Sequence, residues 1–132
     1  QMLGVKRAMV VHASDGLDEI TVTGPTEAYL VEENGSIDHM SIDPGSMGIS
    51  AYKVNDLIGG SSEDNSAFAL ELIEGRGSPA LLDAVSLNAG AGLLVYGIAE
   101  SLSEGYAMAK DAFRSGTVKN KLQQIIETGA HL

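Results

Sequence analysis

The sequence of 132 residues contains no cysteine, which excludes disulfide bonds, thiolate metal sites and thiol catalysis. An absence of cysteine is in keeping with a cytoplasmic protein. Proline is also scarce, with three residues against sixteen glycines, and the glycines follow no repeat. The glycine content therefore indicates turns and close backbone packing, not a low-complexity segment.

Basic residues are few as well. Eight lysines and arginines stand against eighteen acidic residues, which gives a formal net charge of −10. Such a chain repels phosphate backbones and anionic membranes, so we expect neither nucleic-acid nor membrane partners. It also repels a polyphosphate substrate unless a divalent cation lies between the two.

Several common motifs are missing. The sequence has no P-loop and no dinucleotide-binding fingerprint, and its serines and histidines suggest no hydrolytic triad. The first seven residues carry their charges after a short apolar stretch and lead directly into a strand pattern, which is not typical of a signal peptide.

The composition that is present is globular, with 44% hydrophobic and 20% charged residues. Residues 1–132 are enough for one ordinary domain and too few for two. The chain opens on Gln1 and enters a strand pattern almost at once. We therefore expect a single domain that is a piece of a longer protein.

Strand patterns occupy the first third of the chain. The apolar run from Ala8 to Val11 predicts a strand buried on both faces, as in a parallel sheet. Residues 20–23 alternate between apolar and polar and predict a second short strand. Residues 26–33 and 36–41 flank Asn34-Gly35, the pair that a type I′ turn prefers, and predict a β-hairpin.

Helical patterns occupy the remainder. Ser61, followed by acidic residues, predicts the start of a first helix. A second helix, from Pro79 to about residue 99, is apolar nearly all round, but Asp83, Asn88 and three glycines favour a buried core helix over a membrane span. Inside that helix Asn88 needs a buried hydrogen-bond partner. Two amphipathic helices separated by Gly116 close the chain.

Adjacent carboxylates at Asp18 and Glu19 are the strongest candidates for chemistry. They lie in a polar, glycine-containing loop after the first strand, and open α/β sheets bind ligands at the carboxyl ends of their strands. Two neighbouring carboxylates can converge on a hard cation such as Mg²⁺, whose ligands are oxygens. An Asp-Glu pair is common, however, and by itself it more often belongs to a solvated loop.

Other polar residues have structural interpretations beside functional ones. His12 ends the first strand next to the pair, where a hydrogen-bonded structural histidine is favoured over a catalytic one. Asp15 is either a turn residue, which is favoured, or an outer partner of the metal. Arg7 could reach a phosphate, although a surface role is the simpler interpretation. We expect His39 and His131 to be solvated.

Residues 12–19 read His-Ala-Ser-Asp-Gly-Leu-Asp-Glu and resemble the His-Gly-x-Asp-Gly-Leu-Asp-Glu signature of anthranilate phosphoribosyltransferases. The resemblance covers nearly the whole chain in order and spacing. It continues through residues 3–12, 23–27, 57–60, 63–65 and 87–89 and ends in a helix at 104–116. One departure is Ala13 in place of the family's glycine, a residue often used where φ is positive.

This resemblance implies an α/β fold: part of a nucleoside phosphorylase/phosphoribosyltransferase-type domain with a mainly parallel sheet, a β-hairpin and four C-terminal helices. It implies phosphoribosyl transfer from phosphoribosyl pyrophosphate to anthranilate, in tryptophan biosynthesis, by an intact homodimeric enzyme. It also implies that Asp18 and Glu19 bind Mg²⁺ at the phosphoribosyl pyrophosphate site.

The same resemblance shows what this sequence does not contain. The family's Gly-Thr-Gly-Gly-Asp loop and Lys-His-Gly-Asn-Arg segment do not occur in it, and neither does the N-terminal helical domain. We therefore assign no catalytic residue and expect the isolated chain to be inactive.

Two alternatives remain open. The related pyrimidine nucleoside phosphorylases share the overall fold, although residues 12–19 and the hairpin favour the transferase; an assay of the longer parent with thymidine and phosphate discriminates. The chain could instead be a non-catalytic folding or assembly module, because loss of a helical domain exposes apolar surface. Sedimentation measured against concentration tests that alternative.

Overall fold

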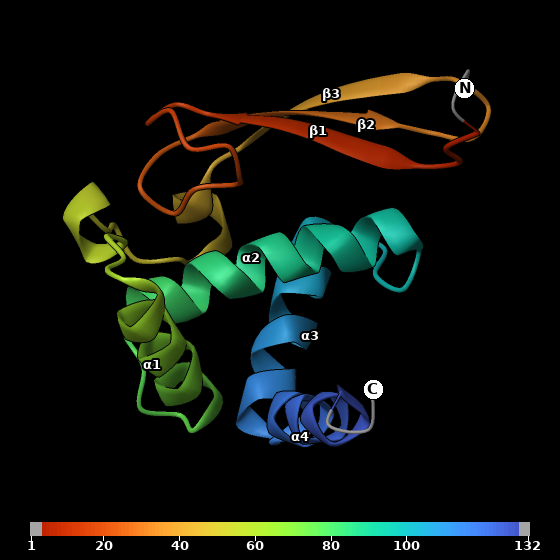
Figure 1. The fold of residues 1–132 in the computed structure, drawn as a ribbon. Helices are drawn as coiled ribbons and strands as arrows, with labels where there is room; N and C mark the ends of the chain where they lie inside the picture. The colour runs from red at the N-terminus through yellow and green to blue at the C-terminus, as the bar shows by residue number, and fades with distance from the viewer. Residues whose placement is uncertain (1–3, 130–132) are drawn as a thin grey trace.

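The computed structural model describes residues 4–129, and its first layer is a three-stranded sheet (Figure 1). The strands lie in the order β1 (Ala8–Ala13), β2 (Thr26–Val31), β3 (Ile37–Ile42). Both pairings are antiparallel. The α/β class is confirmed, but the prediction of a mainly parallel sheet is wrong for the described residues. A short apolar run suits strands of either direction, so the sequence of β1 could not decide between them.

One face of the sheet is covered and the other is open. In β2, Ala28 and Leu30 are buried, whereas Glu27 and Tyr29 are exposed. The same alternation places Val10 of β1 on the outer face, where 60% of the residue is exposed. β1 is therefore not buried on both faces as expected; antiparallel sheets commonly cover only one.

The predicted hairpin between β2 and β3 is confirmed, but its turn differs from the expected type I′. The Gly35 N–H donates to the Glu32 carbonyl (2.9 Å), and the Glu32 N–H donates to the Ser36 carbonyl (3.0 Å). Gly35 has φ 86°, and no described residue other than glycine has positive φ. Asn34 is therefore not left-handed. The turn is the three-residue type with a left-handed glycine, and the Asn34 side chain accepts from the Ser36 N–H (2.8 Å).

Four helices follow the sheet within residues 4–129, as expected: α1 (Ser62–Ile73), α2 (Pro79–Tyr96), α3 (Leu102–Arg114), α4 (Thr117–Gly129). Two short 3₁₀ helices, η1 (Pro44–Met47) and η2 (Val54–Asp56), lie between β3 and α1. Residues 20–23, predicted as a strand, are irregular. The main chain of Ile20 pairs with the Asn88 side chain instead of with a neighbouring strand.

The first residues of α1 and α3 are capped by serine side chains, to different extents. The Ser61 side chain accepts from the Asp64 N–H, and the Asp64 carboxylate accepts from the Ser61 N–H, which completes a capping box. At α3, Ser101 accepts from the Glu104 N–H (3.2 Å), but Glu104 reaches the N–H of Glu100 (2.7 Å). Only half of a capping box forms there.

α2 lies beneath the covered face of the sheet and carries the core (Figure 1). Leu87 and Ala91 of α2 cluster with Ile20, Ala28 and Ile42. By length and composition alone α2 could cross a membrane. Its packing between the sheet and α3 is that of a core helix.

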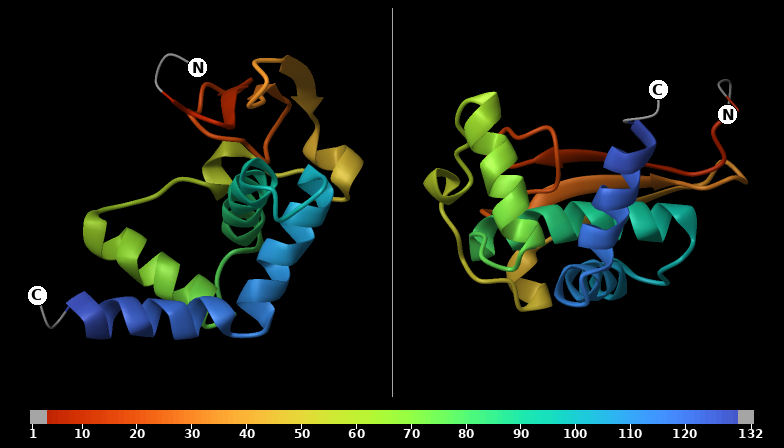
Figure 2. Two further views of the ribbon diagram at one scale, coloured as in Figure 1. Left: turned by 90° about the vertical axis from the view of Figure 1, so that its right-hand side faces the viewer. Right: turned by 60° about the horizontal axis from the view of Figure 1, so that its bottom comes forward.

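Beneath α2 the chain forms a layer of further helices (Figure 2). α3 crosses α2 where Gly90 meets Gly105, and a Cβ atom at either position would overlap the backbone of the opposite helix. α4 continues from α3 and runs beside α1, with a groove of about 330 Å³ between residues such as Leu70 and Ile126. The prediction that glycines of α2 allow close backbone packing is confirmed at Gly90. It is wrong at Gly92, where an added Cβ atom would meet nothing within 4 Å.

Candidate metal-binding loop

The loop of residues 14–25 joins β1 to β2 and folds back between the end of the sheet and α2 (Figure 1). Asp15 holds it from one side. Its Oδ2 accepts from the hydroxyls of Thr21 (2.6 Å) and Thr23 (2.5 Å), and its Oδ1 accepts from the Leu17 N–H (3.1 Å). Asp15 is thus a turn residue that also closes the loop, as the favoured interpretation expected.

The pKa of Asp15 reflects these bonds. Partial burial acts to raise it, but the hydrogen bonds from Thr21, Thr23 and the Leu17 N–H outweigh that effect. The net result is a pKa below the ordinary value of 3.8, so Asp15 is ionised at neutral pH.

Asn88 of α2 holds the loop from the other side. Its Oδ1 accepts from the Ile20 N–H (2.9 Å), and its Nδ2 donates to the carbonyls of Ile20 (2.8 Å) and Ala84 (3.0 Å). The buried partner expected for Asn88 is therefore the main chain of a residue 68 positions earlier in the sequence.

Asp18 and Glu19 lie between these two attachments, and both are exposed. Neither carboxylate has a hydrogen-bond or ion-pair partner among residues 4–129. Their oxygens are the hard donors that Mg²⁺ takes, and Mg²⁺ is usually held by one or two carboxylates together with substrate phosphates and water. No group of three or more acidic, histidine or cysteine side chains within the described residues could hold a metal. The donor set thus fits an ion shared with a substrate, not a closed metal cage.

The histidines near the loop take no part in it. His12 is exposed and lies opposite Glu27 in the sheet, and its side chain has no hydrogen bond to another described residue, so the expected hydrogen-bonded role of the side chain is not seen. The His39 Nε2 lies 2.5 Å from the Glu27 Oε2, and its ring stacks on Tyr29, so it is half-exposed and partnered instead of simply solvated. His131 lies outside the described residues.

Arg7 has a structural role. Its guanidinium pairs with both carboxylate oxygens of Glu32 at 2.8 Å, and its Nη1 donates to the Leu94 carbonyl at the end of α2 (2.6 Å). The hydrogen bonds between the two side chains raise the pKa of Arg7 and lower that of Glu32. The simpler interpretation of Arg7 is therefore favoured over a phosphate ligand.

A buried ionic network was missed at the level of sequence. Asp83, 6% exposed, accepts from Lys110 Nζ (2.6 Å), Tyr106 Oη (2.6 Å) and Tyr52 Oη (2.8 Å). Burial acts to raise the pKa of Asp83, but the bonds from Lys110 and the two tyrosines hold it below 3.8. The signal available was a lone aspartate in an apolar helix. The network joins α2 to α3 and does not reach the loop.

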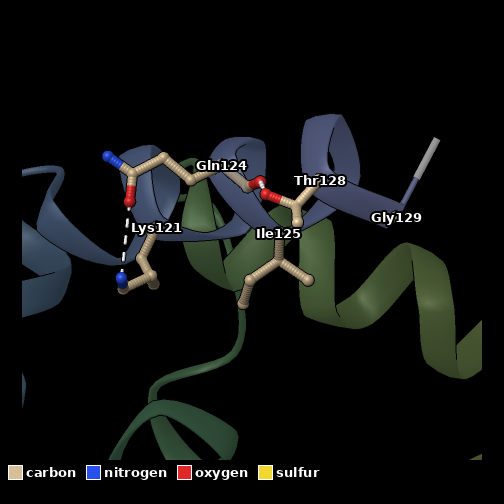
Figure 3. Close-up of a pocket in the computed structure, with 5 residues that line it drawn as sticks. All are labelled: Lys121, Gln124, Ile125, Thr128 and Gly129. Atoms are coloured by element: carbon tan, nitrogen blue, oxygen red, sulfur yellow. Dashed lines mark hydrogen bonds between the residues drawn. The ribbon is translucent and has the colours of Figure 1, made fainter. Parts of the chain in front are cut away.

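Surface hollows lie elsewhere on the described part of the chain, and neither Asp18 nor Glu19 lines them. The pocket in Figure 3, about 420 Å³, follows the exposed side of α4 and is lined by Lys121, Gln124, Ile125, Thr128 and Gly129. Lys121 is its one titratable lining residue, so it offers no acid–base pair. A second groove, about 390 Å³, runs between β1 and α2 and includes Ile20 and Asn88 in its wall.

Comparison with known proteins points to one family. The family model described as "Glycosyl transferase family, a/b domain" matches residues 1–119. Anthranilate phosphoribosyltransferase of Methylorubrum extorquens (strain PA1) is 45% identical over 124 residues, which cover 94% of this chain and 36% of that enzyme. The enzyme of Laribacter hongkongensis (strain HLHK9) is 42% identical over 127 residues, covering 95% and 36%. The chain thus spans 36% of the length of these relatives.

Solved structures agree. Anthranilate phosphoribosyltransferase from Thermus thermophilus superposes with a TM-score of 0.75 at 35% identity, covering 89% of this chain and 34% of that one. The Saccharomyces cerevisiae enzyme in complex with PRPP and Mg gives 0.80 at 18% identity, covering 94% and 35%, and shows the fold alone. The resemblance drawn from residues 12–19 is confirmed. Because the family model spans most of the sequence, the chain belongs to this glycosyl transferase family and carries its α/β domain.

Proposed function

We propose that the chain is a C-terminal α/β domain of an anthranilate phosphoribosyltransferase. The intact enzyme transfers a phosphoribosyl group from phosphoribosyl pyrophosphate to the amine of anthranilate and releases pyrophosphate. We place this reaction in the cytoplasm and in a homodimer. The similarity to relatives of that name supports the proposal. The observation that carries it is the exposed pair Asp18 and Glu19, which has no partner within residues 4–129 and lies in a loop that is fixed on both sides.

Asp18 and Glu19 would hold one Mg²⁺ ion. When bound, such an ion neutralises the charge of a pyrophosphate leaving group and orients it. Within residues 4–129 neither carboxylate is paired with a lysine or arginine. A cation can therefore bind them without first displacing a basic side chain.

The charge of the chain gives this pair a second purpose. With a formal net charge of −10 the surface repels a polyanion. Two carboxylates that capture a dication convert one patch of that surface into a place where phosphate oxygens can bind. The family's other phosphate-binding segments do not occur in this sequence, so we expect the isolated chain to bind weakly.

Calorimetric titration of the purified chain with inorganic pyrophosphate, with and without Mg²⁺, tests the site. We expect binding only in the presence of Mg²⁺ and its loss in Asp18→Ala/Glu19→Ala. A matched control, Glu33→Ala/Asp38→Ala, removes the same charge from exposed positions of the hairpin and should bind as the parent does. Undiminished binding by Asp18→Ala/Glu19→Ala would contradict the proposal.

Activity of the isolated chain is a separate matter. We expect no turnover when the isolated chain is mixed with anthranilate, phosphoribosyl pyrophosphate and Mg²⁺. The fluorescence of anthranilate measures the reaction. Turnover by the chain alone would mean that residues 1–132 contain a complete active site, which contradicts our assignment of no catalytic residue to it.

A further inference from the structure

The side chain of Asn88, in α2, forms hydrogen bonds with the main chain of the loop at Ile20. Its amide satisfies both main-chain groups of Ile20 at once, accepting from the N–H (2.9 Å) and donating to the carbonyl (2.8 Å). This is the two-way exchange that a neighbouring strand makes in an antiparallel ladder. A third bond, to the Ala84 carbonyl (3.0 Å), fixes the amide against the helix that bears it.

These bonds fix the backbone next to the acidic pair. Ile20, 2% exposed, is held in the core by its side chain and in orientation by Asn88. The Ile20 N–H belongs to the peptide plane shared with Glu19, so fixing that plane limits the directions in which Glu19 can point. The other end of the loop is closed by Asp15.

We infer that Asn88 is a positioning residue for the cation that Asp18 and Glu19 bind, an inference that rests on the proposed function. Two flexible exposed carboxylates lose conformational entropy when they converge on one ion. A loop that is already fixed at Ile20 loses less, so it binds the ion more tightly. Partners behind metal ligands act in this way in other proteins, and their loss typically weakens metal binding about 10–100-fold.

The chemistry of the amide explains why the position is asparagine. A carboxamide both donates and accepts, and Ile20 presents one group of each kind. Aspartate at neutral pH only accepts, so it would repel the Ile20 carbonyl. Alanine makes neither bond but leaves space at a partly exposed position, where water can satisfy the freed groups.

The test measures binding of Mn²⁺, a paramagnetic substitute for Mg²⁺, to the chain in the presence of inorganic pyrophosphate. We expect Asn88→Ala to weaken Mn²⁺ binding about ten-fold or more and to speed hydrogen exchange at the Ile20 amide. Asn88→Asp, which keeps the size and one acceptor, provides a second variant should Asn88→Ala not fold. It should also weaken binding.

The control separates positioning from general stability. Tyr106→Phe removes the hydroxyl that donates to Asp83 and accepts from Lys110; among the described residues this hydroxyl makes no hydrogen bond to the loop, and its loss does not change the charge. It should lower the free energy of unfolding yet leave the Mn²⁺ affinity within about two-fold of the parent, because the change lies outside the metal's surroundings. If Tyr106→Phe lost as much Mn²⁺ affinity as Asn88→Ala does, the effect of Asn88 would be one of general stability, and the inference would be overturned.

The remaining outcomes distinguish the two proposals. If Asp18→Ala/Glu19→Ala abolishes Mn²⁺ binding while a folded Asn88→Ala or Asn88→Asp binds like the parent, the positioning role is wrong and the metal site stands. If Asp18→Ala/Glu19→Ala itself binds like the parent, the metal site is wrong and the positioning role falls with it.

Discussion

At the scale of residues, the candidate site is a loop held in place by hydrogen bonds from two polar side chains. Asp15 and Asn88 between them hold Ile20, Thr21 and Thr23 through hydrogen bonds of 2.5–2.9 Å. Those that the Asp15 carboxylate accepts are stronger than hydrogen bonds between neutral groups. The acids that would meet a ligand are thereby left exposed on a backbone with little freedom.

The pKa of the Asp15 carboxyl tests whether the hydrogen bonds that hold the loop form in solution. Carbon-detected NMR titration of the parent should give a midpoint below 3.8, because the threonine hydroxyls favour the ionised form. Thr21→Val/Thr23→Val removes both hydroxyl donors and should raise the midpoint while the Leu17 N–H still donates. An unchanged midpoint in that variant would mean that the hydroxyls turn elsewhere in solution.

From the sequence, only the candidate metal ligands of this site and the role of Asp15 could be predicted. Asp18 and Glu19 follow from a local motif, and the turn role of Asp15 follows from its place beside Gly16. For Asn88 the sequence predicted only that its side chain needs a buried hydrogen-bond partner. Its partner lies 68 positions away and is a main-chain group, which carries no mark in the sequence.

At the scale of elements, the contact between α2 and α3 depends on glycine where the helices cross. A Cβ atom at Gly90 would overlap the backbone of Gly105 and Tyr106, and backbone cannot move aside as a flexible side chain can. Glycine weakens a helix by about 0.5–1 kcal/mol relative to alanine. That cost is accepted at position 90 because the close approach requires it.

A pair of substitutions on the same helix isolates this effect. We expect Gly90→Ala to lower the free energy of unfolding by about 1–3 kcal/mol through overpacking. Gly92→Ala, two positions later and facing open space, should raise it by about 0.5–1 kcal/mol. Urea denaturation measures both. Equal stabilisation by the two alanines would mean that the helices cross less closely than described.

Elements that depend on neighbours in sequence were predicted well, and those that depend on distant pairing were not. The helix start at Ser61 and the Asn34-Gly35 hairpin involve residues within a few positions of one another. The direction of β1 depends on which strand lies beside it, and the apolar run at Ala8–Val11 is the same for either. Residues 20–23 alternate like a strand because Ile20 and Val22 are buried in the core, although no strand of the described residues pairs with them.

At the scale of the whole molecule, charged side chains within residues 4–129 join the layers in two ways. Arg7 ties the sheet to the end of α2 at its partly exposed rim. Asp83 and Lys110 join α2 to α3 in the interior, with side-chain exposures of 8% and 23%. A buried pair is costly to break because the remaining charge lacks both a partner and water.

Lys110→Met tests how much the interior pair holds the layers together, and the pH dependence identifies the cause. The folded-state pKa of Asp83 is lowered, so its contribution to stability is present above the unfolded pKa near 3.8 and is lost as the pH falls through the folded value. The pKa of Lys110 is raised: burial opposes this, but the bonds to Asp83 and Tyr106 prevail. Its contribution is therefore lost only as the pH rises above 10.5 and through that raised value.

Between these limits the pair is fully ionised, and at pH 7 we expect Lys110→Met to lower the free energy of unfolding by about 3 kcal/mol. The difference should shrink as the pH falls below 3.8 and through the lowered pKa of Asp83, because a protonated Asp83 no longer needs a cation. Arg114→Met is the control: it removes the same charge from an exposed pair with Asp111, and should change stability by less than about 0.5 kcal/mol. A loss for Lys110→Met that is equal at pH 3 and pH 7 would show that packing of the lysine chain, and not its charge, holds α3 on α2.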